Sequence, residues 1–220
     1  MDRKPEPELM DLAEEVDAYV AGDFTAVNQA FAERLVELCG KREQARALDL
    51  GTGPADIPIR VWRARPKWKI VAVDASAPML DRARAAIDGA GAAGAIELSL
   101  ADAKDTGLPP GSFDVVFSNS ILHHVASPIT FWAEVRRLAK SGATIFLRDL
   151  ARPQDDAKAH ALVKQHAGAE SELLQEEFYR SLLAAYTLEE VRTQIAAAGL
   201  GALTTQMSSD RHLDVFGEVV

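Results

Sequence analysis

The sequence has little of what stabilises small secreted proteins. Of its 220 residues only Cys39 is a cysteine, which excludes a disulfide framework and any cysteine-based zinc cluster. No stretch approaches the roughly 20 apolar residues that a membrane helix needs, and the first residues lack the apolar core of a secretory signal. We therefore expect a protein of the cytoplasm that has no membrane partner.

Positive charge is also scarce. Asp and Glu number 33 against 24 Lys and Arg, a formal net charge of −9, which argues against a nucleic-acid partner. The one basic cluster runs from Arg60 to Lys69 and holds two tryptophans, Trp62 and Trp68. We interpret it as a solvated face with two anchoring indoles, although basic residues interleaved with aromatics can also bind RNA.

Short apolar runs alternate with helical stretches through the middle of the chain. Alternation of this kind favours a parallel, doubly wound sheet, and unbroken apolar runs indicate strands covered by helices on both faces. The expected strands are 45–50, 70–73, 96–100, 113–118 and 144–148, and the expected helices lie near 57–64, 78–86 and 128–138.

The two ends of the chain have a different pattern. Residues 1–8 are polar and predict a frayed tail, and apolar spacing between Asp11 and Cys39 predicts two helices separated at Gly22-Asp23. Residues 153–185 predict a helical segment that is too long for a plain crossover between strands.

The last part of the chain predicts one helix and a hairpin. Thr187 and Glu190 have the spacing of a capping box, and Gly199 stands where a helix ends. Residues 200–207 and 212–220 then predict a β-hairpin. We divide this single domain into N-terminal helices (1–44), a cofactor-binding core (45–150), a helical lid (151–186) and a last helix with its hairpin (187–220).

The most informative stretch, LDLGTGPAD, begins at Leu48 at the expected junction of the first strand and its helix. Gly51 and Gly53 allow a tight turn and the close approach of a ligand. Asp74 ends the second strand 21 residues after Gly53, where an acid can accept both hydroxyls of a ribose. Asp102 follows the third strand, where a carboxylate can accept from an adenine amine. These features share the carboxyl edge of the sheet, where open α/β folds bind ligands.

These residues resemble class I S-adenosylmethionine-dependent methyltransferases. The resemblance covers about residues 45–148 and the closing hairpin, and includes Met79-Leu80 and the run FDVVFSN at 113–119. It implies an α/β, Rossmann-like, seven-stranded, mostly parallel sheet in the order 3-2-1-4-5-7-6, with a C-terminal antiparallel hairpin and a helical cover. One departure is Pro54-Ala55, where the family often has a third glycine.

The resemblance also implies a cofactor, S-adenosylmethionine, which leaves as S-adenosylhomocysteine. The residues that it assigns to the cofactor site are Asp49, Gly51, Thr52, Gly53, Asp74, Ala75, Met79, Asp102, Ala103 and Asn119.

The acceptor side is less clearly marked. His123 and His124 follow the fourth strand and are candidate catalytic residues, because histidine suits proton transfer at neutral pH, although packing roles fit them as well. Phe24 would close the pocket from the N-terminal side. The candidate substrate residues are Tyr19, Arg148, Asp149, Tyr179, Tyr186, Arg211 and His212. A structural ion pair is an equal alternative for Arg148 and Asp149. No metal is predicted, because two histidines in tandem do not easily face one ion.

The sequence favours methyl transfer to a small molecule by in-line displacement, in which the protein mainly aligns the reactants. Asn119 is followed by Ser-Ile-Leu, not by the Pro-Pro-aromatic run of relatives that methylate adenine or amide nitrogen. One alternative is a noncatalytic cofactor-binding protein. Another is a nicotinamide dehydrogenase, which is disfavoured because Asp56 stands where a third glycine would lie beside a pyrophosphate. The acceptor, the atom methylated and the choice between monomer and homodimer stay open.

Overall fold

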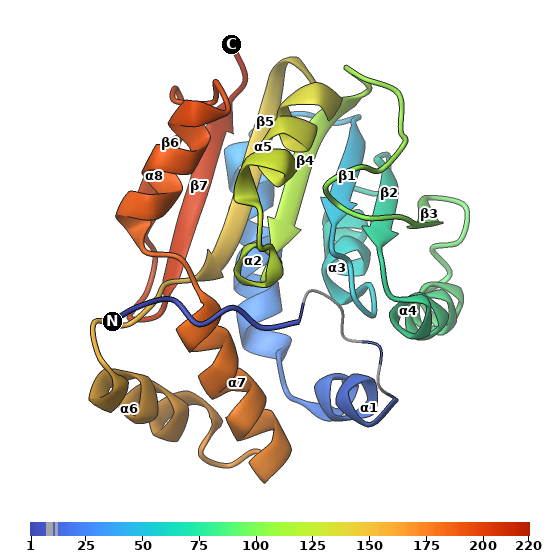
Figure 1. The fold of residues 1–220 in the computed structure, drawn as a ribbon. Helices are drawn as coiled ribbons and strands as arrows, with labels where there is room; N and C mark the ends of the chain where they lie inside the picture. The colour runs from blue at the N-terminus through green and yellow to red at the C-terminus, as the bar shows by residue number, and fades with distance from the viewer. Residues whose placement is uncertain (8–10, 12) are drawn as a thin grey trace.

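A seven-stranded sheet forms the centre of the molecule (Figure 1). The computed structural model describes residues 1–7, 11 and 13–220, and over this part of the chain the strand order is β3-β2-β1-β4-β5-β7-β6. The first five strands pair in parallel, whereas β7 runs antiparallel to β5 and β6. The predicted order and the closing hairpin are confirmed. The strands are β1 (Arg46–Leu50), β2 (Lys69–Asp74), β3 (Ile96–Leu100), β4 (Phe113–Asn119), β5 (Ala139–Leu150), β6 (Thr204–Met207) and β7 (His212–Glu218).

Helices cover both faces of the sheet, which explains the unbroken apolar strands. On β1, Ala47 packs into a cluster with Phe31 of α2, whereas the next residue, Leu48, packs into a cluster with Trp132 of α5. Helices α2, α3 and α4 therefore lie on one face, and α5 and α8 lie on the other (Figure 1). The helices are α1 (Ala13–Ala21), α2 (Thr25–Leu38), α3 (Asp56–Ala64), α4 (Ala77–Ala90), α5 (Pro128–Leu138), α6 (Asp156–Ala167), α7 (Glu172–Ala184) and α8 (Leu188–Ala197), with a short 3₁₀ helix, η1 (Leu122–His124).

Local signals in the last third of the sequence act as expected. The capping box at the start of α8 is confirmed, because the Thr187 hydroxyl accepts from the Glu190 N–H and the Glu190 carboxylate accepts from the Thr187 N–H. Gly199 follows that helix with a φ of +74°. The predicted helical segment 153–185 is two helices, because Ser171 caps the start of α7 with its side chain.

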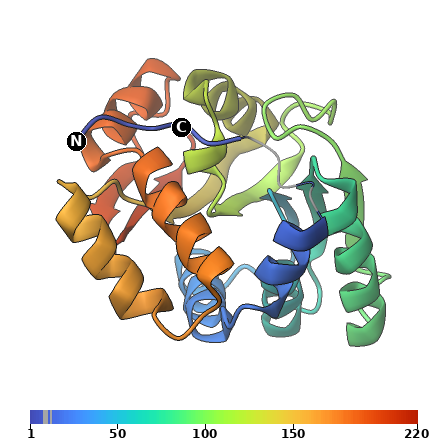
Figure 2. The ribbon, with the colours of Figure 1, turned by 60° about the horizontal axis from the view of Figure 1, so that its bottom comes forward.

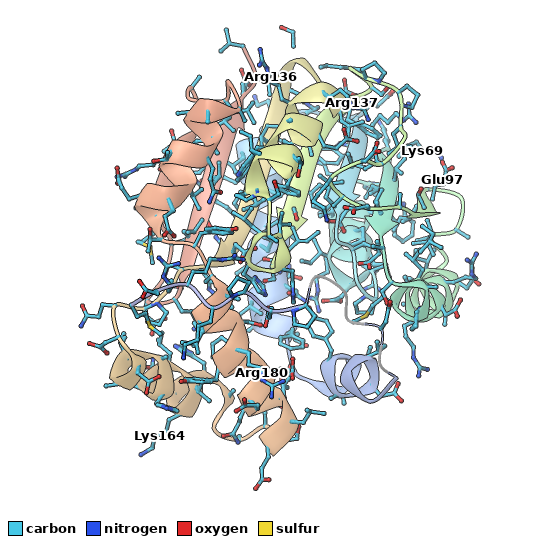
Figure 3. The ribbon with its side chains drawn as sticks, viewed as in Figure 1. Lys69, Glu97, Arg136, Arg137, Lys164 and Arg180 are labelled. Atoms are coloured by element: carbon cyan, nitrogen blue, oxygen red, sulfur yellow. The ribbon has the colours of Figure 1, made fainter. Side chains whose placement is uncertain are left out.

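Several residues of the basic cluster between residues 60 and 69 make contacts within the fold. Trp68 is fully buried and donates its indole N–H to the carbonyl of Arg42 (3.1 Å). Lys67 pairs with Glu43, and Lys69 donates to the carbonyl of Gly94. Cations outside this cluster lie far apart, as Figure 3 shows for Arg136 near the top of the view and Arg180 in its lower part. Among the described residues, no helix is both long and apolar enough to cross a membrane.

Three helices and the N-terminal segment lie at the carboxyl edge of the sheet. Helices α1, α6 and α7 lie below the ends of the parallel strands in Figure 1, and Figure 2 shows them from that side. Leu162 of α6 and Leu182 of α7 pack together with Leu150 at the end of β5. The expectation of a frayed tail is wrong for residues 1–7, since the Lys4 N–H donates to the carbonyl of Leu183 (3.0 Å). Residues 8–10 and 12 lie outside the described part.

Candidate active site

A cavity of about 670 Å³ lies at the carboxyl ends of β1, β2 and β4. Its volume is in the range of small-molecule sites. The structure brings together around it all ten residues assigned to the cofactor: Asp49, Gly51, Thr52, Gly53, Asp74, Ala75, Met79, Asp102, Ala103 and Asn119.

The glycine loop after β1 forms one wall of this cavity. Gly51 has a φ of +75°, and a Cβ there would lie 2.6 Å from the Cδ1 of Ile121. At Gly53 a Cβ would meet nothing within 4 Å, so this backbone leaves an open cradle for a ligand. Ala55 has a φ of +64°, so the turn is left-handed at the position where the resemblance expects glycine. The Cβ of alanine makes this conformation sterically costly. The loop therefore has the shape expected of a cofactor-binding turn.

Buried carboxyl groups give the cavity an acidic wall. Asp49 is only 2% exposed, and burial, with a smaller contribution from the charge of Asp74, raises its pKa to about 7. Asp74 accepts hydrogen bonds from the N–H groups of Gly53 (2.7 Å) and Ser76 (2.9 Å), while burial keeps its pKa above the ordinary value. Such a wall suits a cationic ligand with ribose hydroxyls, and the residues present therefore fit S-adenosylmethionine.

A third carboxylate, Asp56, joins the two helices on one side of the cavity. Its Oδ2 accepts from Asn28 of α2 (2.9 Å) and from Arg60 of α3 (2.8 Å), and all three residues line the cavity. Because Arg60 pairs with Asp56 in the cavity lining, the charge of this carboxylate does not by itself exclude a pyrophosphate.

The N-terminal helices close the cavity with two aromatic rings. Tyr19 and Phe24 stack with their ring centroids 4.8 Å apart, and both line the cavity. A Cβ on Gly22 would lie 2.8 Å from the Phe24 ring, so the turn between α1 and α2 needs glycine for this close packing. Burial raises the pKa of Tyr19 to about 12, so its hydroxyl stays neutral.

The two histidines lie side by side but have different surroundings. His124 lines the cavity, whereas His123 is 4% exposed and its Nδ1 lies 2.6 Å from Asp149 Oδ1. Asp149 also accepts from the N–H groups of Leu122 and Leu150. Burial alone would lower the pKa of His123, but the charge and hydrogen bond of Asp149 raise it above the ordinary value. Burial would likewise raise the pKa of Asp149, but His123 and the backbone donors hold it low.

Six of the candidate substrate residues lie outside the cavity lining. Asp149 contacts His123 and orients its ring. Arg148 makes a bidentate ion pair with Asp214 (2.7 and 2.8 Å), so for this residue the alternative of a structural ion pair applies. Tyr186 donates to the carbonyl of Val125 beneath η1 (2.8 Å). The remaining three have partners elsewhere: Tyr179 donates to Asp156, Arg211 contacts His166, and His212 contacts Ser209. Burial lowers the pKa of His212 to about 4.

Two residues of the N-terminal segment reach this site without any sequence pattern that marks them. Arg3 donates to the carbonyls of Ala184 (2.5 Å) and His123 (2.8 Å), and its guanidinium lies 4.1 Å from the ring centroid of Tyr186. Glu6 Oε1 lies 3.1 Å from the Nδ1 of His124. Residues 1–7 are thus tied to the edge that holds the cavity.

Comparison with known proteins shows which proteins this sequence and fold resemble. Residues 48–147 match the model of a family described as Methyltransferase domain. The chain superposes on a SAM-dependent methyltransferase from Aquifex aeolicus with a TM-score of 0.69 at 18% identity, covering 94% of this chain and 98% of that one. It also superposes on a Haemonchus contortus phosphoethanolamine N-methyltransferase, solved with phosphomonomethylethanolamine and S-adenosylhomocysteine (TM-score 0.68, 18% identity, 89% of this chain and 43% of that one).

Among curated sequences, the chain is 31% identical over 125 residues to a demethylmenaquinone methyltransferase from Roseiflexus, covering 54% of this chain and 48% of the relative. Its matches span 35% to 54% of the length of the curated relatives. Residues 48–147 thus match a methyltransferase-domain family, and the chain shares the fold of solved S-adenosylmethionine-dependent methyltransferases.

Proposed function

We propose that this protein transfers the methyl group of S-adenosylmethionine to a small-molecule acceptor. The observation that carries the proposal is that the glycine loop, Asp49, Asp74 and Asp102 all line one cavity. The Roseiflexus relative supports an acceptor of small-molecule size, because its name describes a quinone methyltransferase.

The cover at the carboxyl edge supports a small acceptor as well. Tyr19 and Phe24 wall the cavity from the N-terminal helices, and His124 and Val125 wall it beside η1. Arg3 ties η1 to the end of α7 through the carbonyls of His123 and Ala184. An acceptor that fits between these groups is held away from bulk water, whereas a macromolecular one would have to displace them.

Methyl transfer requires mainly that the methyl donor and the acceptor be aligned. S-adenosylmethionine, when bound, would supply an electrophilic methyl group on a sulfonium, and its sulfur–carbon bond would break as the acceptor formed its bond to the methyl carbon. The aromatic pair and the glycine loop would hold the two reacting atoms in line, which is a proximity effect. An acceptor that carries a proton must lose it, and His124 lies at the cavity wall where it can take that proton. His123 would position its neighbour from behind, fixed in turn by Asp149.

Titration calorimetry with S-adenosylmethionine tests the first half of this proposal. We expect one cofactor per chain and at least a tenfold loss of affinity in Asp74→Ala, because a carboxylate that accepts ribose hydroxyls is worth about 1.5–3 kcal/mol. Asp88→Ala, an exposed acid on α4, is the matched control and should bind like the wild type. An Asp74→Ala variant that binds as well as this control would refute the assignment.

The second half is tested by turnover. We expect S-adenosylhomocysteine to accumulate above background when the protein is given a panel of small quinols, phenols and amines. Cofactor binding without product from any of these acceptors would favour the noncatalytic alternative.

A further inference from the structure

We propose that Glu6, His123 and His124 form a binding site for one divalent cation of the Zn²⁺ type, built between the N-terminal segment and η1. Each residue offers one ligand atom, and these three atoms lie within 4.8 Å of one another. Glu6 Oε1 is 3.1 Å from His124 Nδ1 and 3.6 Å from His123 Nε2. Ligands about 2.0–2.1 Å from a tetrahedral Zn²⁺ are roughly 3.4 Å apart, so both spacings suit one ion.

Tandem histidines do not easily face one ion, but the geometry of this pair brings one nitrogen of each ring close to Glu6. The two rings belong to the tight 3₁₀ turn η1, and their centroids are only 4.2 Å apart. His123 presents Nε2 and His124 presents Nδ1 to the same carboxylate oxygen of Glu6. Using different nitrogens lets neighbouring residues reach a common point.

Asp149 gives His123 the second partner that metal-binding histidines usually have. The Nδ1 of His123 lies 2.6 Å from Asp149 Oδ1, and Asp149 is itself held by two backbone N–H groups. Donation of the Nδ1 proton to Asp149 leaves the Nε2 lone pair pointing toward Glu6, the arrangement found around metal-bound histidines. A lone pair and a carboxylate oxygen that face each other need a proton or a cation between them.

Burial and charge favour a cation there. The side chains of Glu6 and His123 are 8% and 4% exposed. A buried carboxylate without a counter-charge is costly, and a bound cation would offset that cost. Arg3 donates to the carbonyl of His123, whereas the carboxylates of Glu6, Asp149 and Glu177 lie close enough to act on the cluster, so the net charge around neutral histidines is negative.

The site borders the cavity, because His124 lines it. Three protein ligands are typical of zinc sites that keep one position open for water or substrate. An acceptor oxygen or nitrogen could occupy that position, a role that rests on the proposed function, whereas binding of the ion itself does not. The competing arrangement is a proton-bound cluster, in which His124 Nδ1 donates to Glu6 or to the carbonyl of Pro7 (3.3 Å).

The test uses the full chain, treated with a chelator and then titrated with Zn²⁺ alone by calorimetry near neutral pH. We expect one Zn²⁺ per chain with release of protons from the ligands. Loss of a supporting partner weakens metal sites by about 10- to 100-fold, and we expect Glu6→Gln and His124→Asn to weaken binding by at least as much. His160→Asn, at a histidine on α6 whose side chain is 66% exposed, is the control and should bind like the wild type.

Absence of saturable Zn²⁺ binding would overturn the proposal in favour of the proton-bound cluster, and so would equal binding in Glu6→Gln and His160→Asn. Co²⁺ provides a second measurement on the unmutated chain, because its absorption spectrum reports tetrahedral coordination by oxygen and nitrogen. A spectrum of free, hydrated Co²⁺ at stoichiometric protein would also overturn it. A chain that binds Zn²⁺ but not S-adenosylmethionine would refute only the proposed function, and the reverse would refute only this site.

Discussion

Replacing Asp49 by Asn should make the protein without cofactor more stable and its cofactor binding weaker. Asp49 is buried at the end of β1 in the cavity wall, and its pKa is about 7 instead of 3.8. The folded chain therefore keeps a proton that the unfolded chain releases above pH 4. The free energy of unfolding accordingly falls as the pH rises from about 4 to about 7. Above about pH 7, Asp49 makes little further change to it.

The size of this effect follows from the two pKa values. At about 1.4 kcal/mol per pH unit, the interval from 3.8 to about 7 corresponds to at most about 4 kcal/mol. The variant should gain about 1.7 kcal/mol over the wild type near pH 5 and up to about 4 kcal/mol near pH 8. Urea unfolding of both chains at the two pH values measures this difference, and Asp88→Asn on the exposed face of α4 is the control.

Cofactor binding should change in the opposite direction. Asp49 lines the cavity among the residues that the resemblance assigns to the cofactor, and the positive charge of S-adenosylmethionine favours the ionised carboxylate. Loss of that charge should cost about 1.5–3 kcal/mol, or roughly 10- to 150-fold in Kd. Wild-type affinity should also rise with pH up to about 7. A variant whose gain in stability is the same near pH 5 and near pH 8 would refute the buried-carboxyl argument.

Three further outcomes test other parts of the structure. Gly51→Ala should lose about 2–4 kcal/mol in thermal unfolding, from a left-handed φ and a clash with Ile121, and unchanged stability would show that the loop relaxes. Asp214→Ala should lower the free energy of unfolding by about 3 kcal/mol or more, because it leaves the Arg148 side chain unpaired. A decrease below about 1 kcal/mol would mean that water reaches this ion pair. Arg3→Ala should speed hydrogen exchange around η1 and leave the sheet unchanged, and unaltered exchange at η1 would contradict its role as a tie.

Most of the sheet could be predicted because its signals are local. Val115 and Val116 are both buried although they point to opposite faces, and this continuous apolar pattern is what helices on both sides require. Thr187 and Glu190 mark the start of α8 in the same local way. β5 was the least well bounded strand, since it runs from Ala139 through Gly142 to Leu150, and its first residues carry no apolar run.

The cofactor wall could be predicted for a related reason. Asp49, Gly51 and Asp74 lie at the ends of parallel strands, and topology alone brings those ends to one edge. The acceptor side depends on side-chain direction, which periodicity does not give. Arg148 lies near the end of β5 at the same edge, yet its side chain turns to Asp214 on the neighbouring antiparallel strand.

The N-terminal segment shows where such prediction fails. Arg3 and Glu6 meet their partners more than 100 residues away, on η1 and α7, so no spacing within the segment reports the contacts. Their energy also comes from charges bound to carbonyls and to a hydroxyl, and not from an apolar stripe that a sequence pattern would show. A polar tail is ordinarily solvated because burying its charges is costly. Here acceptors and donors at η1 and α7 offset part of that cost, so the end of the chain that looked least structured completes the candidate site.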